Sequence, residues 1–132
     1  MDARHFGVAE ANRYVPLLQR TFTLVRAELQ RIQEIDAQLG RSAAPAPDRL
    51  AEERAARIRR VQGELQTLAD LGIEVKAVDG LVDFRALLDG RTVYLCWRFG
   101  EEKVDHWHEL EAGFGGRRPI EETDAFAPTY DA

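Results

Sequence analysis

Two histidines, two positions apart, are the residues whose spacing first suggests chemistry. In the string DHWHE, His106 and His108 share a face only if the backbone is extended, because side chains alternate along a strand. An extended pair can supply two metal ligands. The H-x-H pattern alone has no fixed partner spacing, so packed or hydrogen-bonded rings without a metal are favoured, and no metal is assigned. A third ligand, if a metal binds, could come from Asp83, Cys96, Glu101 or Glu109.

A lone cysteine adds a second possible chemistry. Cys96 is the single cysteine of the chain, so no internal disulfide can form, and a reducing cytoplasm is the favoured location. As a nucleophile it would need a lowered thiol pKa and a nearby base such as His108. Lone cysteines are most often small buried apolar residues. We therefore expect Cys96 to be packed rather than reactive.

Three β-rich runs position these side chains. Residues 73–99 hold two Asp-Gly pairs, each typical of a two-residue hairpin turn, and turns of this length set the strand register. We expect a three-stranded antiparallel β-meander with one apolar and one polar face. The apolar rows are Ile73–Ala86–Val93, Val75–Phe84–Leu95 and Ala77–Val82–Trp97. The polar rows are Glu74–Arg85–Tyr94, Lys76–Asp83–Cys96 and Val78–Leu81–Arg98.

The polar face of this meander suggests a third possibility, a site for a small polar ligand. The register places Asp83 opposite Lys76 and diagonal to Arg85 and Arg98, so its simplest role is one member of an ion-pair lattice. The alternative is that Asp83 and Arg98 bind a ligand beneath Trp107 and His108. Residues 100–120 are the one ordered segment left to cover this face.

Two long helices precede the strands. Apolar residues spaced four and three positions apart between Leu18 and Leu39 predict a helix that begins near Pro16 and ends at Gly40. A second helix is predicted from about Asp48 to Leu71. The short connection between them favours an antiparallel hairpin over residues 15–72. We therefore expect an α+β fold, in which this long helical hairpin packs on the apolar face of the three-stranded meander.

The outer faces of these helices alternate arginine and glutamate, which is typical of a solvated surface with pairs four residues apart. A hairpin this long rarely buries its whole apolar stripe on a small sheet. We therefore expect a homodimer, in which two hairpins form a four-helix bundle.

Composition limits the remaining possibilities. The chain has 132 residues and a net charge of −5, which fits one domain and argues against a nucleic-acid or anionic-membrane binder. No apolar run approaches a membrane span, and the first residues lack the apolar core of a signal peptide. We expect a single domain over residues 1–120, followed by a flexible acidic tail over residues 121–132.

Several strings together resemble an uncharacterised prokaryotic family, catalogued as domain of unknown function 2203. They are GLVDFRALLDGRTVYLCWRFGE, WHE, GFGGRRPI and an N-terminal F-x-x-x-EAN with a following proline, and they cover about residues 6–120. The resemblance implies no activity or cofactor. His106 is not part of the family pattern, so the resemblance favours His108 as the functional histidine and weakens the H-x-H metal hypothesis. The positions that define the family are Glu10, Asn12, Gly80, Leu81, Asp83, Phe84, Cys96, Trp97, Gly100, Glu101, Trp107, His108, Glu109, Gly113, Phe114 and Arg117.

We expect a small cytoplasmic binding or interaction module whose recognition face is the polar side of the sheet. The ligand is not identified by the sequence. The alternative is a metal-binding protein or small enzyme that uses His108 with a neighbouring carboxylate or Cys96. The candidate ligand-binding residues are Asp83, Cys96, Arg98, Glu101, Trp107, His108 and Glu109.

Overall fold

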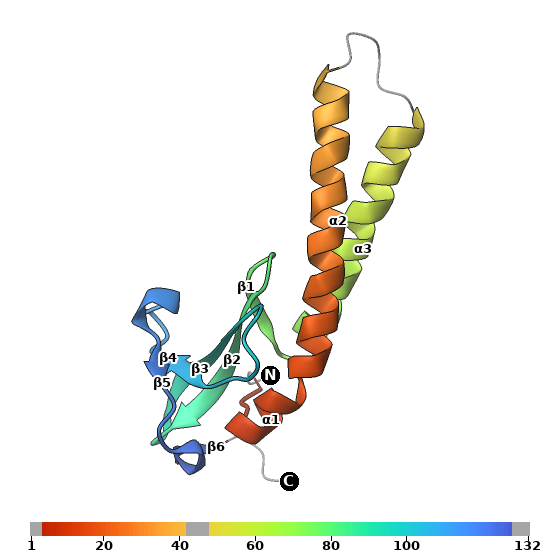
Figure 1. The fold of residues 1–132 in the computed structure, drawn as a ribbon. Helices are drawn as coiled ribbons and strands as arrows, with labels where there is room; N and C mark the ends of the chain where they lie inside the picture. The colour runs from red at the N-terminus through yellow and green to blue at the C-terminus, as the bar shows by residue number, and fades with distance from the viewer. Residues whose placement is uncertain (1–3, 42–47, 128–132) are drawn as a thin grey trace.

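The computed structural model describes residues 4–41 and 48–127, and shows a helical arm that rises from a lobe built on a β-sheet (Figure 1). The described chain is mixed α+β. The proline-containing loop expected between the long helices lies largely outside the described residues, as do residues 128–132 of the expected tail.

Three helices form the N-terminal half. The expected pair of long helices is present as α2, Val15–Arg41, and α3, Asp48–Asp70, which lie side by side and run in opposite directions (Figure 1). A short helix, α1, Val8–Arg13, precedes them. Pro16 is the second residue of α2, where its missing N–H costs no hydrogen bond.

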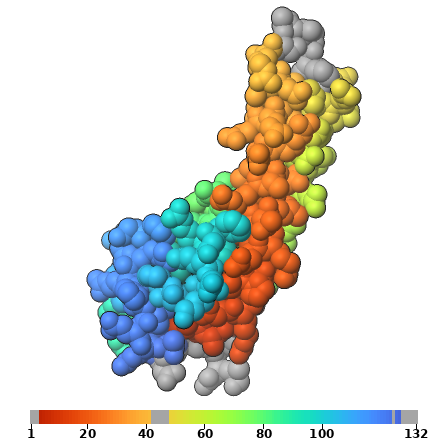
Figure 2. Space-filling model, in the orientation of Figure 1, coloured from red at the N-terminus to blue at the C-terminus, as the bar shows by residue number. Residues whose placement is uncertain are grey.

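The apolar stripe of α2 is only partly buried. Leu18, Phe22 and Val25 are fully buried, whereas Leu29, Ile32 and Leu39 remain half-exposed. Ile35, which lies outside the four-and-three spacing, is fully buried. The stripe differs along its length because the lower part of α2 packs on the sheet lobe, while among the described elements the upper part lies beside α3 (Figure 2).

Charged side chains join α2 to α3. Arg57 of α3 contacts both oxygens of the buried Glu28 of α2, at 3.2 and 3.1 Å, and Arg31 of α2 contacts Glu53 of α3 at 2.7 Å. Hydrogen bonds from Arg31 and Arg57 lower the pKa of Glu53 from 4.5 to about 2. The expectation of a solvated face with pairs four residues apart is therefore incomplete, because most of these ion pairs cross between the helices.

The sheet is antiparallel and larger than the expected three-stranded meander. Residues 100–120 do not simply cover its polar face, because part of this segment pairs with the free edge of the third strand. The strand order is β1-β2-β3-β4-β5, and β6 pairs with β2 beside β1. The strands are β1 Glu74–Ala77, β2 Leu81–Leu88, β3 Arg91–Arg98, β4 His106–His108, β5 Arg118–Pro119 and β6 Phe126–Ala127.

The expected flexible tail begins inside the described fold. Residues 121–127 include a single 3₁₀ turn, η2 (Thr123–Ala125), and strand β6. Phe126 is buried and packs against Trp107, with ring centroids 6.0 Å apart. The buried Phe126 side chain attaches this segment to the fold, although its acidic composition suggested a disordered tail.

The β2–β3 register is the predicted one, from Leu81 opposite Arg98 to Leu88 opposite Arg91. The turn between these strands has positive φ at both Asp89 and Gly90, 52° and 84°, as a type I′ hairpin requires.

The predicted β1–β2 register is wrong. Glu74 lies opposite Asp83 rather than Arg85, and the pairing is irregular around Lys76, so the predicted Lys76–Asp83 row does not form. The turn between the two strands includes Val78 as well as the Asp-Gly pair, and among the two Asp-Gly aspartates only Asp89 has positive φ. The observed partner of Glu74 differs from the predicted one by two residues. Because this number is even, the Glu74 side chain stays on the predicted face of the sheet.

The apolar face of the sheet lies beneath α1, the lower part of α2 and the end of α3 (Figure 1). Phe84, Leu95 and Trp97 are fully buried on this face. The chain before α1 also contributes, because Phe6 inserts its ring here while its N–H donates to the Arg85 carbonyl of β2 at 2.6 Å. The hairpin therefore covers the apolar face with its lower part only.

The described helices, within residues 4–41 and 48–127, include none that is both long and apolar enough to cross a membrane.

Gly80 has a structural role that can be tested. Its φ is 127°, its carbonyl accepts the Phe99 N–H at 2.7 Å, and an added Cβ would collide with the Cβ of Phe99. We predict that Gly80→Ala lowers the free energy of unfolding by about 2 kcal/mol more than Gly90→Ala does. Gly90 also has positive φ but faces open space, so the control isolates the collision. Equal losses in urea denaturation would show that Phe99 moves aside freely.

Candidate functional site

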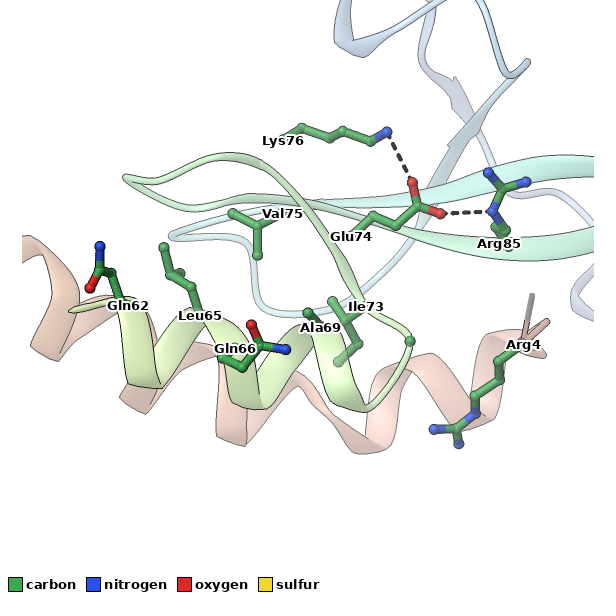
Figure 3. Close-up of a pocket in the computed structure, with 11 residues that line it drawn as sticks. Arg4, Gln62, Leu65, Gln66, Ala69, Ile73, Glu74, Val75, Lys76 and Arg85 are labelled. Carbon is green, nitrogen blue, oxygen red and sulfur yellow. Dashed lines mark hydrogen bonds and ion pairs between the residues drawn. The ribbon is translucent and has the colours of Figure 1, made fainter. Parts of the chain in front are cut away.

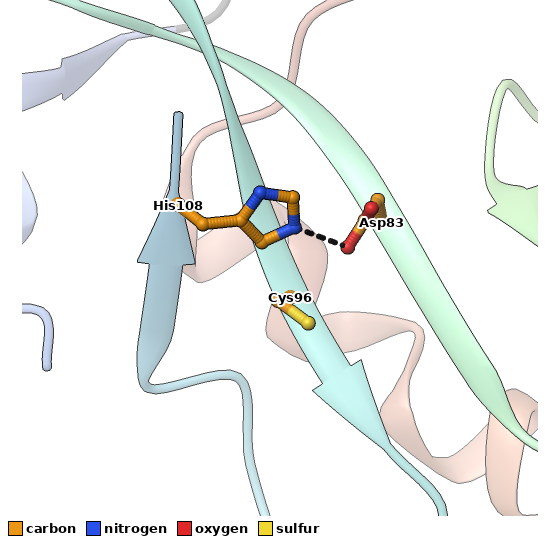
Figure 4. A group of neighbouring side chains, drawn as sticks. All are labelled: Asp83, Cys96 and His108. Carbon is orange, nitrogen blue, oxygen red and sulfur yellow. Dashed lines mark hydrogen bonds and ion pairs between the residues drawn. The ribbon is translucent and has the colours of Figure 1, made fainter. Parts of the chain in front are cut away.

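Three metal-ligating side chains meet on the polar side of the sheet. Asp83 of β2, Cys96 of β3 and His108 of β4 come from three neighbouring strands (Figure 4). The ligand atoms of the three side chains all lie within 4.8 Å of one another. All three are buried, with Asp83 and His108 exposed by only 3% and 2%. The structure thus unites three of the sequence-predicted candidates.

Strand pairing produces this meeting. Asp83 lies directly opposite Cys96 in the β2–β3 ladder, so their side chains leave the same face. β4 pairs with the other edge of β3, and places His108 opposite Tyr94, one row away on that face. The extended backbone of β4 is what the H-x-H spacing required for the two histidines to share a face.

Both ring nitrogens of His108 lie within hydrogen-bond distance of an oxygen atom. Nδ1 lies 2.7 Å from the carbonyl oxygen of Glu109, and Nε2 lies 3.1 Å from Oδ1 of Asp83. A neutral imidazole has a single N–H, so it cannot donate to both oxygens. The contact between Nε2 and the Asp83 carboxyl group therefore needs a second proton on the ring, a proton on the carboxyl group, or a metal ion between the two. An imidazole whose Nδ1 donates to a carbonyl is the usual arrangement of a metal-ligating histidine.

Cys96 is not arranged as a nucleophile. Burial, followed by the nearby charge of Asp83 and its hydrogen bond, raises the pKa of the Cys96 thiol from 9.0 to about 12. A reactive cysteine needs a lowered pKa, so catalysis by a free thiolate is not supported. The same neighbours would favour a bound cation, which removes the thiol proton by direct coordination.

Glu101 has a positioning role beside this cluster. Its Oε1 accepts the Arg98 N–H and the Nη2 hydrogen of Arg117, each at 2.7 Å, and its carbonyl accepts the Trp97 indole N–H at 3.0 Å. These contacts hold the chain where β3 ends. The Arg98 side chain is exposed, and its guanidinium carbon lies 5.5 Å from the centroid of the Phe114 ring.

The other candidates lie apart from the three-residue cluster. His106 shares the face of His108, but its Nδ1 contacts Asp105 at 2.7 Å. The Glu109 carboxylate pairs with Arg91 at 2.6 Å. Trp107 alternates to the opposite, apolar face, where it packs against Phe126. The expected recognition face is therefore divided, and its centre is buried.

The predicted polar row Glu74–Arg85–Tyr94 forms a hydrogen-bonded network beside the cluster, and Lys76, which was expected in another row, joins it. Tyr94 donates to Glu74 at 2.8 Å, and its ring lies 5.4 Å from that of His108. Burial alone would raise the pKa of Glu74, but hydrogen bonds from Tyr94 and Lys76 and the charges of Lys76 and Arg85 outweigh it and lower that pKa. Because Glu74 lies opposite Asp83, its contacts with Arg85 and Tyr94 run diagonally across the strands.

A groove lies between α3 and β1 (Figure 3). Its volume is about 800 Å³, and its floor includes Leu65 and Ile73. Glu74 pairs with both Lys76 at 3.1 Å and Arg85 at 2.8 Å, so its single negative charge offsets one of these two positive charges (Figure 3). The positive side chains of the groove are therefore already engaged in ion pairs.

The N-terminal EAN string holds the fold together. The Asn12 amide accepts the Val104 N–H at 2.8 Å and donates to the Val104 carbonyl at 3.1 Å, so one side chain imitates a strand partner for residue 104. Glu10 pairs with Arg4 at 2.8 Å, and Arg4 donates to the Leu71 carbonyl after α3. These residues join α1 to distant parts of the chain and lie outside the three-residue cluster.

Comparison with known proteins agrees with the resemblance read from the sequence. A family model described as "Uncharacterized conserved protein (DUF2203)" matches residues 4–120. No curated protein and no solved structure matches the chain.

The raised pKa of Cys96 predicts how stability changes in alkaline solution. In the unfolded chain the thiol ionises near pH 9, whereas in the folded chain it keeps its proton up to about pH 12. The contribution of Cys96 to stability is therefore fully present below pH 9 and is lost as the pH rises toward 12. The free energy of unfolding, compared with that of Cys96→Ala, should fall by up to roughly 1.4 kcal/mol per pH unit above pH 9.

This comparison is made by urea denaturation of both proteins with a chelator present, so that metal binding does not contribute. Titration of Lys76 and Tyr94 affects both proteins alike and cancels in the difference. A difference that stays constant from pH 8 to pH 10.5 would contradict the buried, protonated thiol.

Proposed function

Because this chain belongs to the DUF2203 family, whose description names no activity, we propose a function from its own side chains: it binds a divalent transition metal, best matched by Zn²⁺, through Asp83, Cys96 and His108. The single observation that carries this proposal is the convergence of a carboxylate, a thiol and an imidazole from three strands in one buried cluster.

The donor set supports zinc over harder cations. Zn²⁺ is bound by cysteine sulfur, histidine nitrogen and carboxylate oxygen, whereas Mg²⁺ and Ca²⁺ prefer oxygen alone. Ligand atoms around a tetrahedral Zn²⁺ lie roughly 3.3 to 3.8 Å apart. The three atoms here lie within 4.8 Å, so small side-chain rotations are enough to close the site. The Nδ1 contact of His108 with the Glu109 carbonyl would orient Nε2 toward the ion.

Three protein donors leave the fourth position of a tetrahedral ion to a water molecule or another donor, and it is the burial of the cluster that favours a structural role for the metal. A catalytic zinc site keeps a position open to water and substrate. Here Asp83 and His108 are almost completely buried and Cys96 is fully buried, so a substrate has no direct access. A bound ion would instead tie β2, β3 and β4 to one another. The same burial argues against recognition of a partner directly through Asp83 or His108.

Zinc binding should be measurable on the isolated protein. After treatment with a chelator, we expect one Zn²⁺ per chain by calorimetry. The melting temperature should rise, since free Zn²⁺ at 100 times the dissociation constant adds about 2.7 kcal/mol of stability. Co²⁺ in place of Zn²⁺ should give a thiolate-to-metal charge-transfer absorption. Asp83→Asn, Cys96→Ser and His108→Gln should each weaken binding at least about tenfold.

The matched control is His106→Gln, since His106 lies on the same strand and face but outside the cluster. This variant should bind Zn²⁺ within about twofold of the original protein. Equal loss in His106→Gln and His108→Gln, or a Co²⁺ spectrum without thiolate absorption in the unmodified protein, would overturn the proposal. The Co²⁺ spectrum needs no variant, so misfolding of a variant does not hide the answer.

We also propose that two chains associate through the helical arm. The arm extends beyond the sheet lobe (Figure 2). Leu29 and Ile32 of α2 line a groove of about 770 Å³ that reaches Asp79 of the β1–β2 turn. Aliphatic side chains half-exposed along a helix are what a second hairpin would cover. A second copy of this chain is therefore the occupant we propose.

Light scattering tests this association. The unmodified protein should show twice the chain mass of 14.9 kDa at high micromolar concentration. Ile32→Arg should reduce the mass to that of one chain, because it places a charge in the apolar contact. Ala56→Arg, which adds the same charge at an exposed position on α3 outside this groove, should remain dimeric. A single-chain mass for the unmodified protein at that concentration would exclude the dimer.

A further inference from the structure

Another cavity shares no lining residue with the groove of Figure 3 or with the metal cluster. It has a volume of about 430 Å³, within the range of small-molecule sites. α2, the β1–β2 turn and the end of β3 surround it. Its lining includes Arg26, Arg98, Phe99, Phe114, Leu81 and Gly80.

The two arginines give this cavity uncompensated positive charge. The Arg26 guanidinium donates to the Asp79 carbonyl oxygen at 3.0 Å, which holds it at the turn without neutralising it. Among the described residues, neither Arg26 nor Arg98 forms an ion pair with a carboxylate. The Asp79 carboxylate at the rim leaves the lining with a formal charge of +1. In the groove between α3 and β1, by contrast, Glu74 already pairs with two cations.

Two aromatic rings accompany these cations. The Arg26 guanidinium lies over the Phe99 ring, 4.9 Å from its centroid, and Arg98 lies 5.5 Å from the centroid of Phe114. Phe114 is one of few large apolar side chains that remain exposed, at 38%. Stacking uses the flat face of a guanidinium and leaves its N–H edge free to bind an oxyanion with two parallel hydrogen bonds.

Arg98 is held toward the cavity by its neighbours. Its backbone N–H is bound by Glu101, and Glu101 also binds Arg117, whose guanidinium lies 4.7 Å from the centroid of the Phe114 ring. Phe114 therefore contacts Arg117, which pairs with Glu101, and Arg98, which has no ion pair among the described residues. The turn from β3 and the loop after β4 fix this arrangement, so a ligand would meet a preformed site.

We propose that this cavity binds small aromatic anions, molecules that carry a carboxylate or phosphate group on a flat ring. The oxyanion would pair with Arg98 and Arg26, and the ring would pack against Phe99 and Phe114. Leu81 adds an aliphatic wall. The proposal is independent of metal binding.

The test uses benzoate and phenyl phosphate as probes, followed by amide shifts in nuclear magnetic resonance spectra. Inorganic phosphate and phenol supply the two halves of the ligand separately. We expect saturable binding of at least one aromatic anion, at least about tenfold tighter than either half, with shifts at Gly80 and Phe99. The ratio of the two affinities distinguishes a carboxylate ligand from a phosphate ester.

Arg98→Gln is the primary variant, because Arg26 also borders the α2 groove proposed for dimer contact. It should weaken binding of the aromatic anion about tenfold or more. Arg59→Gln, which removes the same charge from an exposed position on α3, should leave the affinity within about twofold. Arg26→Gln should weaken binding in the same direction as Arg98→Gln.

Three results would overturn the proposal: no saturable binding of either aromatic anion, equal weakening by Arg98→Gln and Arg59→Gln, or inorganic phosphate binding as tightly as phenyl phosphate. Each titration is repeated with Zn²⁺ and with a chelator. Anion binding that persists in the chelated protein separates this site from the metal site, so failure of one leaves the other standing.

Discussion

The pairing of β2 with β3 is the constraint on which the rest of the molecule depends. Eight residue pairs, from Leu81–Arg98 to Leu88–Arg91, are fixed by the tight turn at Asp89 and Gly90. Because side chains alternate across a strand, this register sends one set of residues under the helices and the other set to the opposite side. A slip by one position would exchange the two sets. β4 then extends the same alternation by pairing with β3.

The polar side of the sheet is unusual because its centre is as well buried as the apolar core. Asp83 and His108 are nearly inaccessible, and burial of such groups costs free energy unless each finds a partner. The contact between Nε2 of His108 and Asp83 supplies part of that compensation, and a cation shared with Cys96 would supply more. Binding of the proposed ion would couple the stability of the fold to the metal supply.

Much of the architecture follows from short-range patterns, and the exceptions have identifiable physical causes. The β2–β3 register could be predicted because Asp89 and Gly90 adopt the positive φ values that their types allow. The β1 register could not, because Val78 joins the first turn and nothing in the local sequence marks a three-residue connection. The two long helices followed from apolar spacing, whereas the Glu28–Arg57 contact depends on how two helices dock.

The candidate site was predictable in its members but not in its geometry. Residue types and the family resemblance singled out Asp83, Cys96 and His108 together with several residues that lie elsewhere. Selection among them required knowing that the chain after β3 returns as β4 on that edge. The two hydrogen bonds between the Asn12 amide and the Val104 backbone join residues 92 positions apart, and no local spacing could have indicated them.

The irregular pairing of β1 has a consequence for behaviour at high concentration. β1 lies at one edge of the sheet, where unpaired backbone groups can recruit a strand from another chain. Its four residues are interrupted between Val75 and Ala77, and the exposed Lys76 lies at that interruption. A short, bent strand that carries a charge is a poor template for an incoming strand. The same distortion that displaced the register thus protects the protein from edge-to-edge aggregation.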